Sequence, residues 1–375
     1  MLLVDTLSSA NDFGVDLAVA LDPLVDLTVL TVKGSRLRAG DCARVIEAFP
    51  EYWGRSGRFA KLMDQLAAML MLTREIWRHR HGAIHVQFFR VAWMEMPLYL
   101  LLRPLMARLI VTAHNALPHE RRFWHKWTAR VWYRRLDCIH VLSRHTGEIL
   151  QSQFGVAAER ILYAPHGCYA RFLRDHPPAA AAGTRERLGV ALGEHLVLYC
   201  GLMRPYKGVD RLIDAATRLA TPGTRIHAAG RCAEPLLGEL RDRLKKADLG
   251  ERFRLVPQFV ENQELSDLLA AADLVVFPYH HIYQSGAVLL AMTYGKAVLT
   301  SDLAGFREYV RHGESGWICD TTDPVAFGAA IDLLMRDEAL RNRLSSAARL
   351  ACETEFAWDQ IAHAIAGAYA REPKQ

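Results

Sequence analysis

The feature that most constrains this chain is a regular alternation of short apolar runs with longer helical patterns. Short β-branched runs separated by helix-length segments are typical of parallel strands joined by helical crossovers. In the first half, strands are expected near residues 2–4, 25–32, 83–87, 109–112, 137–142 and 160–164, with helices near 58–80 and 93–106. In the second half, strands are expected at 196–201, 225–229, 253–256 and 274–277, with helices at 209–219, 235–247 and 263–272. The chain is therefore predicted to be α/β, built from Rossmann-like units.

The length of the chain predicts two domains, because 375 residues exceed what a single core usually supports. The segment 175–183 is rich in proline, alanine and glycine without periodicity, which is typical of a linker. We therefore expect an N-terminal domain over 1–175 and a C-terminal domain over 184–355. The amphipathic C-terminal segment 356–375 is expected to pack back onto the first domain. Two doubly wound domains of this kind should face each other across a cleft, where such sheets bind ligands.

Composition excludes several classes of protein. The net charge of +5 is mild, which suits an anionic small ligand or an acidic membrane surface better than nucleic acid. The seven cysteines are scattered, odd in number and form no Cys-x-x-Cys, so we expect a reducing cytoplasm and neither a zinc cluster nor a disulfide framework. The N-terminus has no basic segment before its apolar run and is interpreted as a strand. The most apolar later window, 94–112, is interrupted by prolines and arginines, so no membrane span is predicted.

The stretch 275–296 combines a buried strand, a polar loop and a helix start. The loop begins at Pro278 and ends at Ser285 and Gly286, after which helix-forming residues continue to Thr293. A helix start presents unpaired N–H groups and a positive dipole end, which together attract a phosphate. The alternative is that Ser285 only caps a helix of the core.

A second loop suited to phosphate follows the strand at 196–201. It reads GLMRPYKG over residues 201–208, in which Gly201 allows close backbone approach. Arg204 offers a planar fork of donors and Lys207 a mobile charge, so the two could clamp a diphosphate. The alternative is a solvated basic turn. A second phosphate-ready loop at the end of another strand makes coincidence a weaker explanation.

Histidines follow two strands of the first half. His114 comes directly after the strand at 109–112, where it could bind a sugar hydroxyl, and His119 and Glu120 are weaker candidates. The alternative is that His114 bonds only to local backbone. Pro165, His166 and Gly167 form a predicted turn in which His166 is interpreted as structural.

Taken in order, these motifs resemble the retaining GT-B glycosyltransferases of family 4. The resemblance runs from about residue 83 to the C-terminus and includes HNALPHE at 114–120, PHG at 165–167, GLMRPYKGVD at 201–210, AADLVVFP at 271–278 and AMTYGKAV at 291–298. It implies a nucleotide diphosphate sugar held mainly by the C-terminal domain, an acceptor held by the N-terminal domain, and neither a metal nor another cofactor. The residues it implicates are His114, Arg204, Lys207 and Gln284 in catalysis, and Gly201, Arg204, Lys207, Tyr279, Ser285, Gly286 and Ala287 in donor binding.

The sequence departs from the family pattern at two places. The family usually carries two glutamates eight positions apart immediately before the Ala-Met pair, and here those positions hold Ile282 and Leu290. Neither side chain can hydrogen-bond, so Gln284 is proposed as a partial replacement for the first acid. The usual Gly-Gly loop near the N-terminus is replaced by 8–14, where Asn11 and Asp12 could touch donor or acceptor.

The resemblance implies transfer of a sugar, with retention of configuration, to a saccharide or lipid-linked acceptor in exopolysaccharide or glycolipid assembly. The leaving diphosphate would accept the proton of the acceptor while Arg204, Lys207 and the helix dipole stabilise its charge. Rival interpretations are an epimerase, a phosphorylase, which would need a lysine that carries pyridoxal phosphate, or a protein that binds nucleotide sugars without turnover.

The segment 121–135 interleaves aromatic and basic residues. Trp124, Trp127 and Trp132 alternate with arginines and a lysine, a composition suited to a helix lying on anionic lipid. A protein with such a helix could sit peripherally at the inner face of the plasma membrane and use a lipid-linked acceptor. The alternative is that the tryptophans pack on the first sheet and the cations form a solvated face.

Overall fold

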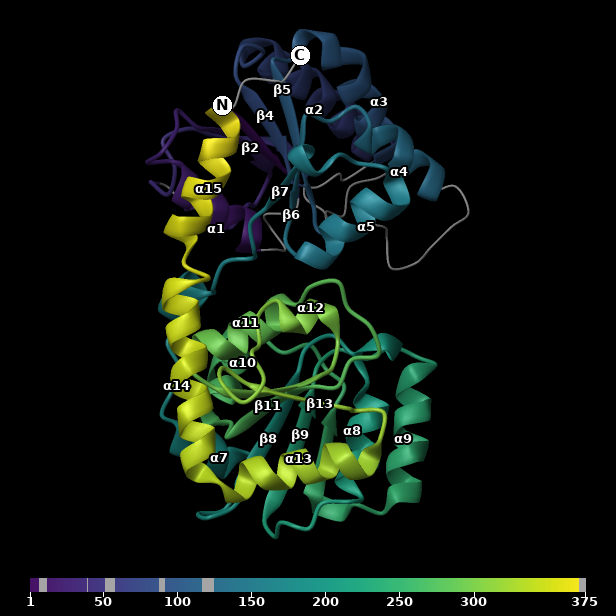
Figure 1. Ribbon diagram of the computed structural model, residues 1–375, viewed down its shortest axis with the longest axis vertical. Helices are drawn as coiled ribbons and strands as arrows, with labels where there is room; N and C mark the ends of the chain where they lie inside the picture. The colour runs from purple at the N-terminus through teal and green to yellow at the C-terminus, as the bar shows by residue number, and fades with distance from the viewer. Residues whose placement is uncertain (7–11, 39, 51–57, 88–91, 117–124, 371–375) are drawn as a thin grey trace. The chain divides into compact units, whose positions relative to one another are not determined.

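A computed structural model of the chain describes residues 1–6, 12–38, 40–50, 58–87, 92–116 and 125–370. The chain divides into two compact units, the first comprising Met1–Gly167 with Phe356–Gln375 and the second Cys168–Glu355. Each unit is built around its own parallel β-sheet with helices on both faces (Figure 1). The α/β alternation expected from the sequence is therefore present in both halves.

Unit 1 contains a sheet of seven strands in the order β3-β2-β1-β4-β5-β6-β7. The strands are β1 Leu2–Asp5, β2 Thr28–Val32, β3 Val45–Phe49, β4 Ala83–Val86, β5 Arg108–Ala113, β6 Cys138–Val141 and β7 Ile161–Tyr163. The helices are α1 Asp12–Leu21, α2 Arg58–Arg78, α3 Ala92–Leu102, α4 His125–Tyr133, α5 Arg144–Phe154 and α15 Trp358–Ala370, with short 3₁₀ turns η1 Arg103–Leu105 and η2 Ala158–Arg160. Five of its seven strands, β1, β2, β4, β5 and β6, are buried along their whole length, as expected when helices cover both faces of a parallel sheet.

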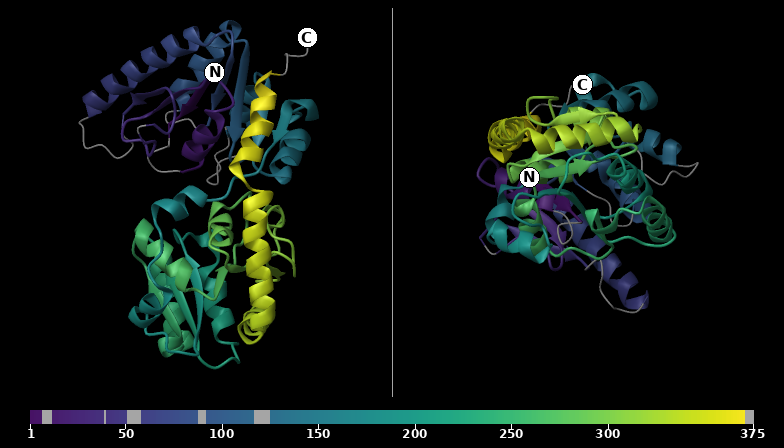
Figure 2. Two further views of the ribbon diagram at one scale, coloured as in Figure 1. Left: turned by 90° about the vertical axis from the view of Figure 1, so that its left-hand side faces the viewer. Right: turned by 90° about the horizontal axis from the view of Figure 1, so that it is seen from below.

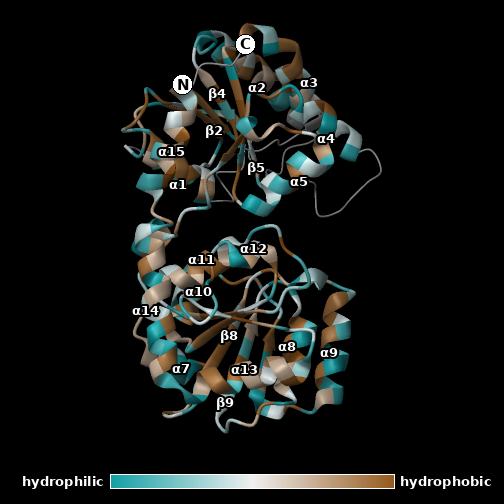
Figure 3. Ribbon diagram, in the orientation of Figure 1, coloured by the Kyte–Doolittle hydropathy of each residue, from teal (hydrophilic) through white to brown (hydrophobic). Residues whose placement is uncertain are grey.

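The two faces of this sheet carry different helices. Side chains of α2, α3, α4 and α5 form one apolar cluster with the sheet, and side chains of α1 and α15 form another. Helices α1 and α15 lie side by side although they come from opposite ends of the chain (Figure 1). Figure 3 shows the hydrophobic strands between these layers. Helix α15 thus completes the core of unit 1.

A hydrogen-bonded chain crosses this sheet from α15 to β7. The hydroxyl of Tyr369 lies 2.7 Å from His85 Nδ1, His85 Nε2 lies 2.8 Å from Thr112 Oγ1, and Thr112 Oγ1 lies 3.0 Å from His140 Nδ1. His140 Nε2 lies 3.0 Å from the carbonyl of Ala164. Because a carbonyl only accepts, His140 must donate from Nε2, and each remaining link then has one donor if both histidines are neutral. Burial favours that neutral form, since it lowers the pKa of His140 from 6.5 to about 4 and that of His85 well below 6.5.

Unit 2 contains a sheet of six strands in the order β10-β9-β8-β11-β12-β13. The strands are β8 His195–Cys200, β9 Thr224–Ala229, β10 Phe253–Val256, β11 Leu274–Phe277, β12 Ala297–Ser301 and β13 Trp317–Cys319. The helices are α6 Ala170–Asp175, α7 Ala181–Arg187, α8 Val209–Ala216, α9 Leu236–Ala247, α10 Asn262–Ala271, α11 Gly286–Thr293, α12 Ala304–Arg307, α13 Pro324–Arg336 and α14 Glu338–Thr354, with η3 Pro205–Lys207 and η4 Gly250–Arg252. Helix α8 illustrates the local logic, because its apolar residues at helical spacing, Val209, Leu212, Ile213 and Ala216, are all buried.

The expected boundary between the domains was misplaced. The proline- and alanine-rich segment at 175–183 is not a free linker but part of unit 2, which begins at Cys168. The carbonyl of His176 accepts from Ser266 Oγ at 2.5 Å, and the backbone N–H of Ala179 donates to Asp267 Oδ1 at 2.8 Å. These bonds fix the segment against α10. Composition alone could not reveal them, because the partners lie about ninety residues away.

Strand β3 and helix α1 are among the elements of unit 1 that were not anticipated. Strand β3 lies at the edge of the sheet, where only Phe49 of its five residues is buried, and the exposed Glu47 interrupts the apolar run used to recognise the other strands. Helix α1 is buried over most of its surface and therefore lacks the amphipathic pattern of a surface helix. Both failures arise because a hydrophobic pattern records how an element is buried, and that depends on its neighbours.

The buried histidines predict a loss of stability in acid. Histidines held neutral in the fold become protonated in the unfolded chain below about pH 6.5, so their contribution is complete above that pH and is lost as the pH falls towards 4. A histidine whose pKa falls from 6.5 to about 4 on folding lowers the free energy of unfolding by about 2 kcal/mol at pH 5, relative to its value above pH 6.5. His140→Gln should reduce the dependence of the unfolding free energy on pH between 6.5 and 5, measured by urea unfolding. His81→Gln, at an exposed position, is the control. Equal slopes for wild type and His140→Gln would contradict the assignment.

Candidate functional site

The two loops singled out from the sequence meet at one edge of the sheet of unit 2. The first, 201–208, follows β8, and the second, 278–285, follows β11. Strands β8 and β11 are parallel neighbours, with Leu274 paired to Val197 and Val275 to Leu198. Their carboxyl ends therefore lie next to each other, at the edge where open α/β sheets bind ligands.

Close backbone contact joins the two loops. Gly208 has φ +70°, and a Cβ built on it would lie 1.8 Å from the carbonyl oxygen of Pro278, so only glycine fits there. The backbone N–H of His280 donates to the carbonyl of Tyr206 at 2.7 Å. The ring of Tyr206 also contacts the rings of Tyr279 and His281. The glycine that ends the first motif is thus required by the second loop.

Lys207 directly precedes Gly208 and so lies beside the contact between the two loops. Its Nζ is 5.2 Å from the centre of the Tyr279 ring and 3.8 Å from the position that a Cβ would take on Gly201. Burial lowers the pKa of Lys207, and the nearby positive charge of Arg204 lowers it further. A bound anion would stabilise the charged form of Lys207, which burial disfavours. Arg204 itself is exposed.

Tyr279 supports the site from below and does not line it. Its side chain is only 1% exposed, and its ring packs against Phe277 and Phe306. Burial raises the pKa of its hydroxyl, while a hydrogen bond with the side chain of Ser285 opposes that rise. The buried ring of Tyr279 therefore positions Lys207 and Ser285 and offers almost no surface to a ligand.

The start of α11 is not capped by the side chain of Ser285. Ser285 is the N-cap residue, but it makes no side-chain hydrogen bond to the helix, and it is buried against Tyr279. Simple capping of a core helix is thus not the role that the structure gives it. The first residues of the helix, Gly286 and Ala287, are half-buried. Their backbone N–H groups belong to the turn whose donors have no partner within the helix.

Two further residues hold this edge in place and were not recognised from the sequence. Arg211 on α8 donates from Nη1 to the carbonyl of Tyr279 and to Thr321 Oγ1, both at 3.0 Å. Gly230, directly after β9, has φ +150°, and a Cβ on it would lie 1.9 Å from the carbonyl oxygen of Gly201. Gly230 could have been recognised from the sequence, because it directly follows a predicted strand, as Gly201 does. Arg211 had none, since its partners are distant in sequence.

The positions of the missing acids contain side chains without hydrogen-bonding groups. Ile282 and Leu290 are both half-buried. A Cβ on Gly305 would lie 2.7 Å and 2.9 Å from the carbonyl oxygens of Tyr283 and Ile282, so the loop packs tightly on α12. Gln284 is half-buried, and its Oε1 is buried without a hydrogen-bond partner in the described part of the chain. A buried acceptor of this kind calls for a ligand or water.

His114 belongs to unit 1, where it follows β5. Its ring meets the edge of Phe13 with centroids 4.9 Å apart, and His166 meets the same phenylalanine at 4.9 Å. Burial lowers the pKa of His114 well below its usual value, and His140 and His166 lower it further, so it is a neutral hydrogen-bonding group at pH 7. Asp12 begins α1 and pairs with Arg36 at 2.8 Å. Residues 119, 120 and 11, also named from the sequence, lie outside the described residues.

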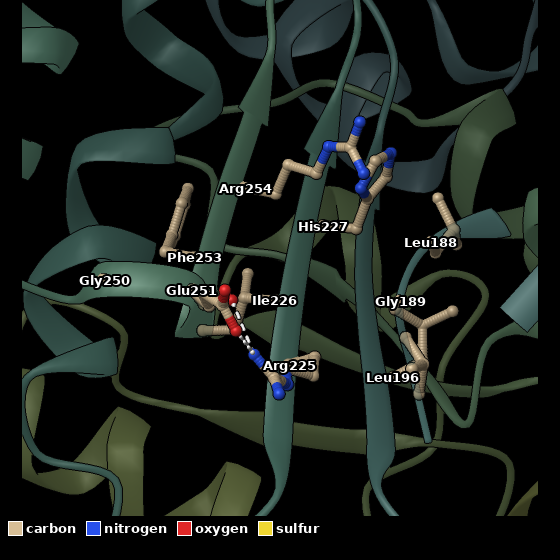
Figure 4. A pocket seen from close by; sticks show the side chains of 11 residues that line it. Leu188, Gly189, Leu196, Arg225, Ile226, His227, Gly250, Glu251, Phe253 and Arg254 are labelled. Atoms are coloured by element: carbon tan, nitrogen blue, oxygen red, sulfur yellow. Dashed lines mark hydrogen bonds and ion pairs between the residues drawn. The ribbon is translucent and has the colours of Figure 1, made fainter. Parts of the chain in front are cut away.

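A cavity of about 330 Å³ lies elsewhere in unit 2 (Figure 4). It is lined near the starts of β8, β9 and β10 by residues that include Leu196, Arg225 and Phe253. Arg225 is held there by Glu194 at 3.0 Å and Glu251 at 3.3 Å, so its charge is already matched. Because it opens beside the amino-terminal ends of the strands, this cavity is not part of the loop site.

The geometry defines a pair of nucleotide-binding-type domains, and the comparisons identify the family. A sequence model described as "Glycosyl transferases group 1" matches residues 183–351, and one described as "Glycosyltransferase Family 4" matches residues 14–169. Together they match most of the chain, which belongs to the GT-B glycosyltransferases of the family 4 type.

Curated relatives agree with this assignment. The chain is 29% identical over 243 residues to D-inositol 3-phosphate glycosyltransferase of Xylanimonas cellulosilytica, covering 64% of this chain and 58% of that protein. It is 32% identical over 190 residues to glycogen synthase of Mycobacterium tuberculosis, covering 50% of this chain and 44% of that protein. The chain thus spans about half the length of the curated relatives it matches.

Solved structures confirm the predicted GT-B fold. HepE of Anabaena, in a complex with UDP and glucose, superposes with a TM-score of 0.76 at 18% identity and covers 98% of both chains. Sucrose-phosphate synthase of Thermosynechococcus elongatus gives a TM-score of 0.76 at 18% identity, over 98% of this chain and 97% of that one. At this level of identity the likeness establishes the fold.

The contact between Gly208 and Pro278 predicts a large effect of one methyl group. Gly208→Ala should lower the melting temperature, because the new Cβ must displace the loop after β11. Gly250→Ala is the matched control, since Gly250 has φ +51° but a Cβ there would meet no described atom within 4 Å. The control should show only backbone strain, about 1–2 kcal/mol. Thermal unfolding measures the effect of each substitution, and equal losses of stability in the two variants would count against the loop contact.

Proposed function

We propose that the protein is a glycosyltransferase that moves a sugar from a nucleotide diphosphate sugar to a saccharide or lipid-linked acceptor with retention of configuration. The observation that carries this proposal is that Tyr279 contacts Lys207 through its ring and Ser285, the N-cap residue of α11, through its hydroxyl. A cation and a helix start on one support suit a diphosphate. The complex of HepE with UDP and glucose supports the choice of donor class.

The proposed reaction uses electrostatic stabilisation of the leaving group. The acceptor hydroxyl oxygen forms a bond to the anomeric carbon on the face from which the diphosphate departs. The bond between that carbon and the diphosphate oxygen breaks, and the diphosphate takes the hydroxyl proton. Lys207, Arg204 and the N–H groups at the start of α11 stabilise the negative charge that grows on it. None of these steps requires a metal ion or another cofactor.

Residues on either side of the diphosphate are assigned by the same argument. Gly201 adopts φ +135°, a conformation that favours glycine, and Gly286 and Ala287 provide backbone N–H groups. Gln284 is proposed to accept a hydrogen bond from a hydroxyl of the donor sugar through its buried Oε1. His114, neutral at pH 7, is proposed to bind the donor sugar from unit 1 as a hydrogen-bonding group and not as a cation.

A second candidate function is nucleotide-sugar binding without turnover, or epimerisation. Hydrocarbon side chains at Ile282 and Leu290 favour it, because they cannot supply charge to a sugar-like cation in the transition state. Calorimetry with UDP, GDP and ADP, followed by a product assay with donor and acceptor, separates the alternatives. Binding without product would support the second candidate, and conversion of donor alone would identify an epimerase.

The proposed setting is the cytoplasm, in exopolysaccharide or glycolipid assembly. Six of the seven cysteines are buried and all seven are free thiols, a usage that suits a reducing compartment. A thermal-shift screen of UDP-, GDP- and ADP-sugars identifies the donor. An activity screen of lipid-linked and free saccharides then identifies the acceptor, and the acceptor shows whether the protein serves exopolysaccharide or glycolipid assembly.

Lys207→Ala should reduce turnover about a hundredfold, because loss of one group that stabilises a developing charge costs on the order of 3 kcal/mol. The melting temperature should change little, since the Tyr279 ring beneath is held by Phe277 and Phe306. Lys245→Ala, an exposed lysine on α9, is the control for charge alone. Steady-state kinetics would contradict the assignment if Lys207→Ala kept the full rate.

Gln284→Ala should strongly lower turnover with the fold intact, because it removes a buried acceptor that has no partner in the described part of the chain. Far-ultraviolet circular dichroism checks the fold, and a coupled assay for released nucleotide diphosphate measures turnover. Gln151→Ala, at an exposed position on α5, should leave turnover unchanged. Unchanged turnover in Gln284→Ala would remove Gln284 from the site.

A further inference from the structure

The solvent side of α2 is apolar. Five residues on this helix, spaced so that they share one face, are large, hydrophobic and exposed: Leu62, Met63, Leu66, Leu70 and Trp77. Leu70 is 74% exposed. The opposite side of the helix packs into the core of unit 1 through Ala68, Leu72 and Ile76. A surface helix normally shows polar residues to water, so both sides of this one are suited to burial. Helix α2 is the long dark-blue helix in the left-hand view of Figure 2.

Exposed apolar residues also occur on α3, η1 and α4. Leu101 on α3 is 75% exposed, Trp127 on α4 is 69% exposed, and Leu105 and Val131 are exposed as well. The inner sides of α2, α3 and α4 join one core cluster, so these helices cover the same face of the sheet. Two contacts tie them together: the Ala107 N–H donates to the Arg80 carbonyl at 2.7 Å, and the Tyr99 and Trp132 rings lie 6.2 Å apart. We call the exposed apolar residues of α2, α3, η1 and α4 the outer apolar face.

The exposed charges beside this face have one sign. The cations are Arg74 and Arg78 on α2, Lys126 and Arg130 on α4, and Arg134 and Arg135 directly after it. Among the residues of α2, α3, η1 and α4 whose side chains the structure describes, no exposed one is Asp or Glu. Glu75 lies within 4.0 Å of Arg44, Arg74 and Arg78, but its carboxylate is buried under them. Over residues 126–135, where the side chains are described, helix α4 and the two arginines after it therefore present cations without an exposed Asp or Glu.

The tryptophans of this region have different roles. Trp132 is buried against Tyr99, so it belongs to the core, as one interpretation of the sequence held. Trp127 is exposed and belongs to the outer apolar face. Trp124 lies outside the described residues. The basic and aromatic segment thus supplies only one edge of a wider surface that is centred on α2, and α2 was not singled out from the sequence.

We propose that the outer apolar face docks on a bilayer that contains anionic lipid. Leucine and tryptophan side chains would enter the boundary between headgroups and acyl chains, and the arginines and lysine beside them would meet lipid phosphates. A second copy of the chain is a poorer partner, because it would bring cations of the same sign together. No helix in the described ranges is long and apolar enough to cross a bilayer, so the contact is peripheral. The inference is independent of the proposed sugar transfer, because it uses no residue of that site.

Flotation with vesicles tests this proposal without any sugar donor. The protein should float with vesicles of phosphatidylcholine and phosphatidylglycerol at low salt, and flotation should decrease at high salt or with phosphatidylcholine alone. Failure to float with the anionic vesicles at low salt would overturn the proposal. Turnover on a soluble acceptor is assayed in parallel, so that loss of docking and loss of catalysis are seen separately.

Single substitutions locate the contact. Leu70→Glu should lower the vesicle partition coefficient about tenfold or more, because one inserted leucine is replaced by a charge of the same sign as the lipid. Trp127→Glu should act in the same direction. Leu350→Glu is the matched control, since Leu350 on α14 is 59% exposed but lies in unit 2. Equal flotation of Leu70→Glu and wild type would overturn the proposal.

Light scattering without lipid tests the rival partner. If wild type were a dimer and Leu70→Glu a monomer, the outer apolar face would be an interface between copies and the lipid proposal would fail. A monomer in both cases, together with loss of flotation in Leu70→Glu only, supports the lipid surface.

Discussion

The close approach of two backbone segments at Gly208 and Pro278 is the constraint on which the candidate site depends. With no Cβ between them, the loop after β8 can lie on the loop after β11, and Lys207 is then carried over the ring of Tyr279. The hydroxyl of Tyr279 in turn engages Ser285 at the start of α11. One glycine thus places a cation and a helix start against the same tyrosine, and these are the two groups proposed to bind the leaving diphosphate.

Unit 1 depends on buried polar groups that are neutral and mutually paired. The chain from Tyr369 through His85, Thr112 and His140 links the last helix to strands that precede it by more than two hundred residues. Such a network tolerates burial only while each member has a partner, which is why acid should weaken it. Helix α15 therefore completes the packing on one face of the sheet of unit 1. The opposite face of the same sheet differs, because its covering helices α2, α3 and α4 also carry apolar residues on their solvent sides.

The two loops of the candidate site could be located from the sequence because their signals are local. A glycine, an arginine and a lysine directly after a strand, or a small polar residue before a helix, have the same meaning wherever the strands lie. The support beneath them could not be predicted in this way. Tyr279 looked like a ligand contact but is buried, and Arg211 looked unremarkable but bonds to Tyr279 and Thr321. These roles depend on partners far apart in the sequence.

The sequence by itself determined the α/β class, the two-unit architecture and the positions of the two loops of the candidate site, because hydrophobic periodicity and turn chemistry are properties of short segments. Only the tertiary structure decided where unit 2 begins, that Ser285 serves Tyr279 and not the helix cap, and that α2 leaves an apolar side uncovered. The physical reason is the same in each case. Burial and hydrogen bonding are settled between segments that meet only in the folded chain.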